Sequence, residues 1–127
     1  MNIWYKSLIK PPLTPPDSYF PVAWSILYTL MGIAFFIVLL KPDSVDKLKA
    51  IGLFLFQLIL NFMWSYVFFK LQSPLLGMID VVFLFLILLI TMYYFFKVSK
   101  IAGFLMIPYL LQVIFAIYLN LGILILN

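Results

Sequence analysis

Asp80 is the only acidic residue within the long apolar segments of this chain, which makes it the first candidate for chemistry. A carboxylate within a membrane span costs at least about 2.5–3.5 kcal/mol on insertion scales, so it usually faces a helix bundle or marks a functional site. Asp80 follows Pro74 by six residues, close to one end of its apolar run. Its position favours a packing role near the membrane interface, with ligand binding or proton transfer as the alternative.

The residue types that most catalytic and metal sites require are missing from the sequence. The chain has no cysteine and no histidine, which excludes disulfides, thiol redox chemistry, Cys/His metal sites and catalysis by those side chains. The sequence also shows no nucleophile–base pair, no phosphate-binding loop and no carboxylate cluster with metal-ligand spacing. We therefore expect no catalytic constellation, no metal site and no resident cofactor.

Two stripes of polar and small residues have the spacing of one helix face. The stripes consist of Gln57, Asn61, Trp64 and Ser65, and of Tyr109, Gln112, Ala116 and Asn120. Polar side chains of this kind can bridge helices, each bond contributing about 0.6 kcal/mol. Alternatively, the two stripes converge on a pocket in which a few polar groups interrupt an aromatic lining. The sequence leaves both readings open.

Aromatic residues near the N-terminus could contribute to such a pocket. Trp24 and Tyr28 are one helical turn apart. Trp4, Tyr5 and Tyr19 could anchor the chain at the membrane interface. At the mouth of a pocket they could instead stack on a flat ligand.

The elements that position these residues are predicted to be membrane-spanning helices. Hydrophobic residues make up 67% of the chain and charged residues only 9%. Four apolar runs each reach the roughly 20 residues that cross a bilayer, and backbone hydrogen bonding in lipid then favours helices. We predict an all-α integral membrane bundle in one domain, residues 1–127, with helices at about 20–40, 48–70, 74–97 and 101–126. The expected partner is the lipid bilayer and not nucleic acid, because the basic residues lie only in loops and at segment ends.

A proline-rich segment precedes the first predicted span. Five prolines lie from Pro11 to Pro21 inclusive, so neither a helix nor a sheet ladder can run through them. We expect residues 4–19 to form a rigid, irregular cap, which suggests a lid over a ligand site.

The lysines at the ends of the spans give a weak orientation signal. One side carries three of them and the other five: Lys6, Lys10 and Lys70, against Lys41, Lys47, Lys49, Lys97 and Lys100. The excess mildly favours a cytoplasmic location for the second set.

Four motifs together resemble the TspO/translocator protein family, also known as tryptophan-rich sensory proteins or peripheral-type benzodiazepine receptors. They are W-Y-x-x-L-x-K-P-x-x-T-P-P from Trp4, F-P-V-A-W-S-I-L-Y-T-L-M-G-I-A from Phe20, L-N-F-M-W-S from Leu60, and P-Y-L-L-x-V-x-F-A-x-Y-L-N from Pro108. The acidic residue Asp80 also fits the pattern of this family. The motifs span nearly the whole chain in the family's order and spacing.

The resemblance implies a five-helix bundle, often a homodimer, whose first loop covers a pocket for porphyrins and synthetic isoquinoline or benzodiazepine ligands. It also implies a transport or sensing role. The expected location of this chain is a prokaryotic cell membrane. The candidate ligand-binding residues are Trp4, Tyr19, Trp24, Tyr28, Asn61, Trp64, Gln112 and Asn120. Lys6 or Lys10 could pair with a porphyrin propionate.

The chain departs from the family pattern at several positions. Leu13 and Gln112 stand where the family commonly has tryptophans associated with porphyrin chemistry, and Tyr66 replaces a usual proline. No Lys or Arg follows Tyr118, so the cholesterol pattern is incomplete. The family's first helix is expected upstream of Trp4, and without it one face would be open to lipid or to a second subunit. We would then expect the chain to be unstable alone or to form oligomers.

Two other functions stay open at this point. The first is an enzyme that degrades porphyrin in light, for which the two missing tryptophans are unfavourable. The second is a small four-helix, proton-coupled exporter that uses Asp80. A single acid near an interface is a poor coupling site, and the proline-rich cap would have no role in such an exporter.

Overall fold

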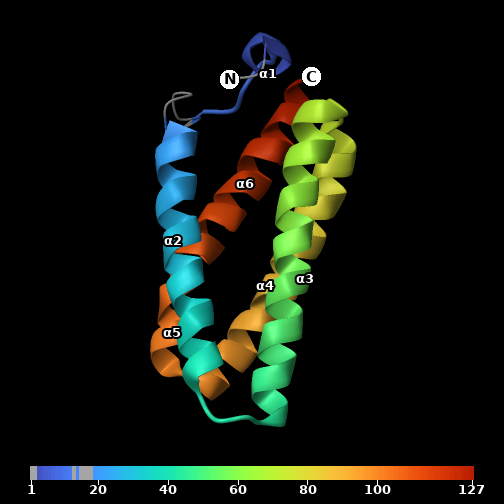
Figure 1. Cartoon of the computed structure of the whole chain (residues 1–127). Coiled ribbons are helices and arrows are strands. Elements are labelled where there is room, and N and C mark those ends of the chain that lie inside the picture. Colours follow the sequence, from blue (N-terminus) through green and yellow to red (C-terminus); the bar gives the residue numbers. More distant parts are fainter. Residues whose placement is uncertain (1–2, 13, 15–18) are drawn as a thin grey trace.

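The computed structural model describes residues 3–12, 14 and 19–127, and all regular secondary structure among these residues is helical. Figure 1 shows the long helices side by side, with both termini at the same end. The helices are α1 (Ile3–Ser7), α2 (Tyr19–Leu40), α3 (Val45–Ser65), the π-helix η1 (Tyr66–Lys70), α4 (Pro74–Val98), α5 (Lys100–Leu105) and α6 (Ile107–Leu126). The described residues contain no strand. The predicted all-α fold is confirmed.

Four helical segments are long and apolar enough to cross a membrane. They cover Pro21–Leu40, Val45–Lys70, Pro74–Val98 and Lys100–Leu126. At most 39% of the most apolar window of each segment is buried inside the protein. The outward surface of the bundle is therefore apolar, as a lipid environment requires.

Serine caps and a proline decide where the helices start and divide. Ser44 accepts a hydrogen bond from the Lys47 amide at 3.1 Å, so α3 begins at Val45, three residues before the boundary expected from the sequence. The fourth apolar run is divided at Met106 into α5 and α6. Pro108 lies in the first turn of α6, where its missing N–H leaves no helical bond unmade.

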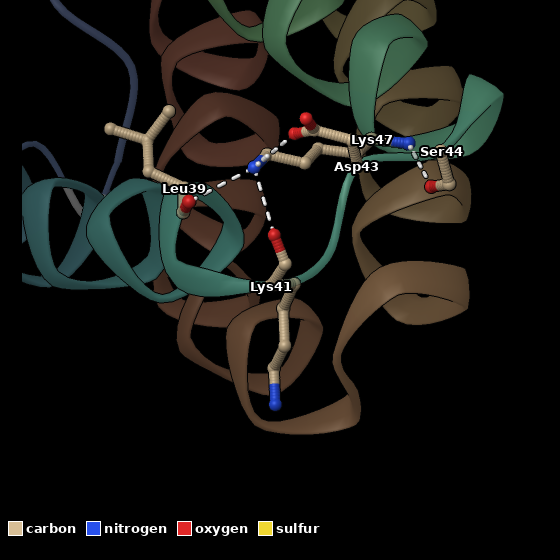
Figure 2. A network of polar contacts seen from close by, with 5 residues as sticks. All are labelled: Leu39, Lys41, Asp43, Ser44 and Lys47. Carbon is tan, nitrogen blue, oxygen red and sulfur yellow. Dashed lines mark hydrogen bonds and ion pairs between the residues drawn. The ribbon is translucent and has the colours of Figure 1, made fainter.

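The turn between α2 and α3 is held by one lysine (Figure 2). Lys47 Nζ donates to the backbone oxygens of Leu39 at 3.0 Å and Lys41 at 2.8 Å, and it lies 3.1 Å from Asp43 Oδ1. An ammonium group near the last carbonyls of a helix satisfies their lone pairs and complements the helix dipole. These contacts tie the first turn of α3 to the end of α2.

Helix α4 is the centre of the bundle. It packs along α3 and also contacts α5 and α6, whereas α2 packs mainly against α5 and α3. Figure 1 shows α2 and α6 diverging toward the end that carries both termini. Residues 3–12, which we call the N-terminal strap, lie at that end of the bundle.

The strap is tied to the last turns of α6. The side chain of Asn127 accepts from the Ile9 amide at 3.1 Å and donates to the Ile9 carbonyl at 2.8 Å. Tyr118 donates its hydroxyl proton to the Pro12 carbonyl. The structure differs from the expected irregular cap in one respect: Ile3–Ser7 form a helix, because the prolines begin only at Pro11.

A glycine on α6 makes room for the strap, which gives a first prediction. A Cβ added at Gly122 would lie 2.6 Å from the ring atoms of Pro11, too close for carbon atoms that do not bond. We expect Gly122→Ala to displace the strap and to speed hydrogen–deuterium exchange at the Ile9 amide. Gly52→Ala is the matched control, since a Cβ there meets nothing within 4 Å. Equal exchange rates in the two variants would contradict this docking.

Candidate ligand-binding site

A cavity of about 170 Å³ lies beneath the strap, between α2, η1 with the end of α3, and α6. It is mainly aromatic and includes two polar side chains. Its lining residues are Tyr5, Trp24, Trp64, Ser65, Phe68, Phe69, Gln112, Ala116 and Leu119. The strap contributes Tyr5, which is buried and packs edge-on against Phe68 and Phe69.

The π-helical turn brings two neighbouring phenylalanines to the same indole. The Leu71 amide donates to the Tyr66 carbonyl at 3.1 Å, the i→i−5 bond of a π-helix. In this wider turn Phe68 stacks on Trp64 with a ring-centre distance of 5.1 Å, while Phe69 meets it edge-on at 5.9 Å. The extra residue in the turn therefore builds one wall of the cavity.

Trp64 is held in place by a buried amide. Its Nε1 donates to Asn120 Oδ1 at 3.0 Å, and Asn120 Nδ2 donates to the Pro74 carbonyl at 2.7 Å. A Cβ at Gly77 would lie only 2.8 Å from Asn120 Oδ1, so the absence of a side chain at Gly77 permits this approach. The chain of contacts links α3, α6 and the start of α4.

A second buried network runs from α2 through α3 to α6. Tyr28 donates to Asn61 Oδ1 at 2.6 Å, Asn61 Nδ2 donates to the Tyr109 hydroxyl at 2.9 Å, and Tyr109 donates to Gln57 Oε1 at 2.8 Å. Trp24 packs against both tyrosine rings. The two polar stripes of the sequence thus meet, and several of their members bridge helices as well as lying near the cavity.

Gln112 belongs to two surfaces at once. It lines the aromatic cavity and also an open groove of about 490 Å³ formed by residues of α2 and α6. Its Oε1 accepts a hydrogen bond from the Tyr19 hydroxyl at 2.8 Å. Gln112 is therefore part of the partition between the cavity and the groove.

The predicted ligand-binding residues fall into two groups. Trp24, Trp64 and Gln112 line the cavity. Four others contact a lining residue: Trp4 packs on Phe68, Asn120 bonds Trp64, Tyr19 bonds Gln112, and Tyr28 packs on Trp24. Asn61 is bonded to Tyr28 and Tyr109 in the second network.

Two of the charged candidates, Lys10 and Asp80, do not line the cavity. Lys10 Nζ is 4.7 Å from the centre of the Tyr5 ring and donates to the Leu8 carbonyl at 3.4 Å, so its charge lies at the strap. The side chain of Lys6, and Leu13 as a whole, lie outside the described residues. Asp80 is buried in α4 and does not line the cavity; its Oδ2 has no hydrogen-bond partner among the described residues. The described residues also contain no group of side chains suited to a metal ion.

Several lining residues were not predicted from the sequence. They are Tyr5, Ser65, Phe68, Phe69, Ala116 and Leu119. Ser65 and Ala116 did belong to the polar stripes, and Tyr5 had been considered as a possible stacking residue. Phe68 and Phe69 gave no signal, because adjacent phenylalanines at the end of an apolar run resemble lipid-facing residues.

Comparison with known proteins places the chain in a family. Residues 1–126 match the model of the TspO/MBR family. The chain is 46% identical to the tryptophan-rich protein TspO of Chlorobaculum tepidum, over 98% of this chain and 79% of that protein. It is 42% identical to the protein of the same name from Archaeoglobus fulgidus, over 100% of this chain and 82% of that protein.

A mammalian relative is also similar. The translocator protein of Sus scrofa is 31% identical, over 92% of this chain and 70% of that protein. With four apolar helices suited to a bilayer and a family match over nearly its full length, the chain is a multi-pass integral membrane protein that belongs to the TspO/MBR family.

Proposed function

We propose that this protein binds a flat hydrophobic ligand, of porphyrin type or smaller, in the aromatic cavity beneath the N-terminal strap, in a transport or sensing role. The observation that carries the proposal is the cavity itself, whose walls include Trp24, Trp64 and Phe68 and whose cover is Tyr5 of the strap. Aromatic walls favour flat aromatic ligands by stacking and edge-on contacts. The names of the relatives, tryptophan-rich sensory protein and translocator protein, are in keeping with such a role.

The size of the cavity decides how a large ligand would bind. Its volume of about 170 Å³ is close to that of an engineered cavity of roughly 150 Å³ that holds benzene. A tetrapyrrole is several times larger, so a porphyrin would bind only when the strap moves outward. The strap is joined to α6 by exposed hydrogen bonds from Asn127, which makes it the element that can move at least cost.

Filling the cavity tests the location of the ligand. Ala116 lines the cavity from α6, and Ala116→Leu would occupy part of its volume. We expect this change to weaken the binding of protoporphyrin IX roughly fivefold or more, because overpacking costs about 1–3 kcal/mol. The measurement is a titration of porphyrin absorbance in detergent. Ile114→Leu, at an exposed position on the same helix, is the control. A pocket elsewhere is indicated if both variants bind like the unmodified protein.

The charge of Lys10 gives a separate prediction. Its position at the strap allows it to pair with a porphyrin propionate. We expect Lys10→Met to weaken protoporphyrin IX binding by at most about fivefold, since an exposed ion pair contributes up to about 1 kcal/mol. Binding of the dimethyl ester, which lacks the charge, should not change. Lys70→Met, an exposed lysine at the end of η1, is the control. Equal losses for acid and ester would show that Lys10 acts through packing.

A further inference from the structure

Lysines and tyrosines gather at the end of the bundle opposite the strap. Figure 1 shows the α2–α3 turn and the α4–α5 junction at that end, away from both termini. Lys97 Nζ lies 4.8 Å from the centre of the Tyr93 ring, and Lys49 Nζ lies 5.4 Å from the centre of the Tyr94 ring. The two rings meet edge-on, with 5.1 Å between their centres. These four side chains of α3 and α4 form one group, which we call the lysine–tyrosine cluster.

The charge at this end of the bundle is mainly positive. Five lysines lie here with two aspartates: Lys41, Lys47, Lys49, Lys97 and Lys100, with Asp43 and Asp46. Lys47 is paired with Asp43, and the charge of Asp46 acts on Lys97. Lys49 and Lys97 are both exposed. An ammonium group on a ring face is attracted by the ring but still has N–H donors for an outside acceptor, so the cluster is suited to an anion.

An apolar groove lies on the same face of α4 as the cluster. The groove has a volume of about 380 Å³, and its lining residues are Met78, Ile79, Val82, Phe83 and Leu86. Leu86, Ile90, Tyr93 and Lys97 follow it at intervals of three or four residues, which places them on one helix face. Leu86, Ile90 and Tyr93 are all exposed. Exposed apolar side chains therefore connect the groove to the charged end of the helix.

The length of this path matches one leaflet of a bilayer. Leu86 precedes Lys97 by eleven residues, which is about 16 Å along a helix axis. Half of a hydrocarbon core of roughly 30 Å is close to that distance. A molecule with an anionic group at Lys97 and an acyl chain along α4 would therefore reach the groove near the middle of the membrane.

We propose that the lysine–tyrosine cluster binds the headgroup of an anionic phospholipid, whose acyl chain lies along α4 toward Leu86. Lys49 and Lys97 bind the phosphate. A choline headgroup is disfavoured, because the lysines already occupy the ring faces that would attract a quaternary ammonium. The excess of lysines predicts that this end is cytoplasmic, and the cytoplasmic leaflet is the one that carries anionic lipids. The site lies at the opposite end of the bundle from the aromatic cavity, and it does not depend on the proposed function.

The test compares two lipids with the same acyl chains, palmitoyl-oleoyl phosphatidylglycerol and palmitoyl-oleoyl phosphatidylcholine. Native mass spectrometry of the full chain, released from detergent micelles, gives the dissociation constant of the first bound lipid. We expect the unmodified protein to prefer phosphatidylglycerol roughly tenfold, since each lysine near an anionic lipid contributes up to about fivefold. The double variant Lys49→Met with Lys97→Met should lower this preference to about twofold or less. Lys49→Arg with Lys97→Arg keeps both charges and should keep the preference.

A matched control separates the cluster from the general charge of this end. Lys41→Met with Lys100→Met also removes two exposed lysines here, one at the end of α2 and one at the start of α5, and it should leave the preference unchanged. The inference is wrong if both double methionine variants lose the preference equally, or if Lys49→Met with Lys97→Met retains it.

A competitor without acyl chains distinguishes a lipid site from a site for free phosphate esters. sn-Glycerol 3-phosphate presents a phosphate to the same lysines but has no chain to lie along α4. We expect a hundredfold molar excess of it over phosphatidylglycerol to leave the bound lipid in place. Displacement by this competitor would overturn the assignment to a phospholipid.

Discussion

The structure depends on the need of every buried polar atom in a lipid-embedded bundle to find a partner within the protein. Lipid chains offer no hydrogen bonds, so an unpaired amide or hydroxyl inside the bundle is costly. Two short networks meet much of this need, one joining Tyr28, Asn61, Tyr109 and Gln57, the other joining Trp64 and Asn120 to the Pro74 carbonyl. Among the described residues, the buried atoms Gln57 Nε2 and Asp80 Oδ2 are left without a partner. Because each bond has a fixed length, the networks set the register of α2, α3, α4 and α6.

The cavity is a consequence of these networks. The bond from Trp64 to Asn120 favours one orientation of the indole, and a rotation that filled the space in front of it would break this bond. Phe68 and Phe69 are brought to the same indole by the π-helical turn. Large planar side chains held in fixed orientations leave a gap that flexible aliphatic side chains would close. The strap then covers this gap with Tyr5 and connects the N-terminal residues to the end of α6.

The parts of the protein differ in how firmly they are held. The bundle core has many buried apolar contacts, from Ala34 and Val38 through Leu88 and Phe95 to Met106. The strap has a small separate cluster around Tyr5, Phe68 and Ile123 together with exposed hydrogen bonds. Elements with few buried contacts open at lower free energy than the core. A ligand-binding role would use this difference, because the cover can move while the walls stay in place.

The sequence by itself determined the four spans and the polar stripes, because run length and the 3.6-residue period act over local distances. It also indicated Trp24, Trp64 and Gln112, which do lie at one cavity. Only the tertiary structure decided that Phe68 and Phe69 form a cavity wall, that Gln112 bonds to Tyr19, and that Asp80 lies away from the cavity lining. The reason is that an apolar residue in a membrane helix can face lipid or protein equally well. Whether it faces lipid or protein is decided by the neighbouring helices, whose positions depend on contacts between residues far apart in the chain.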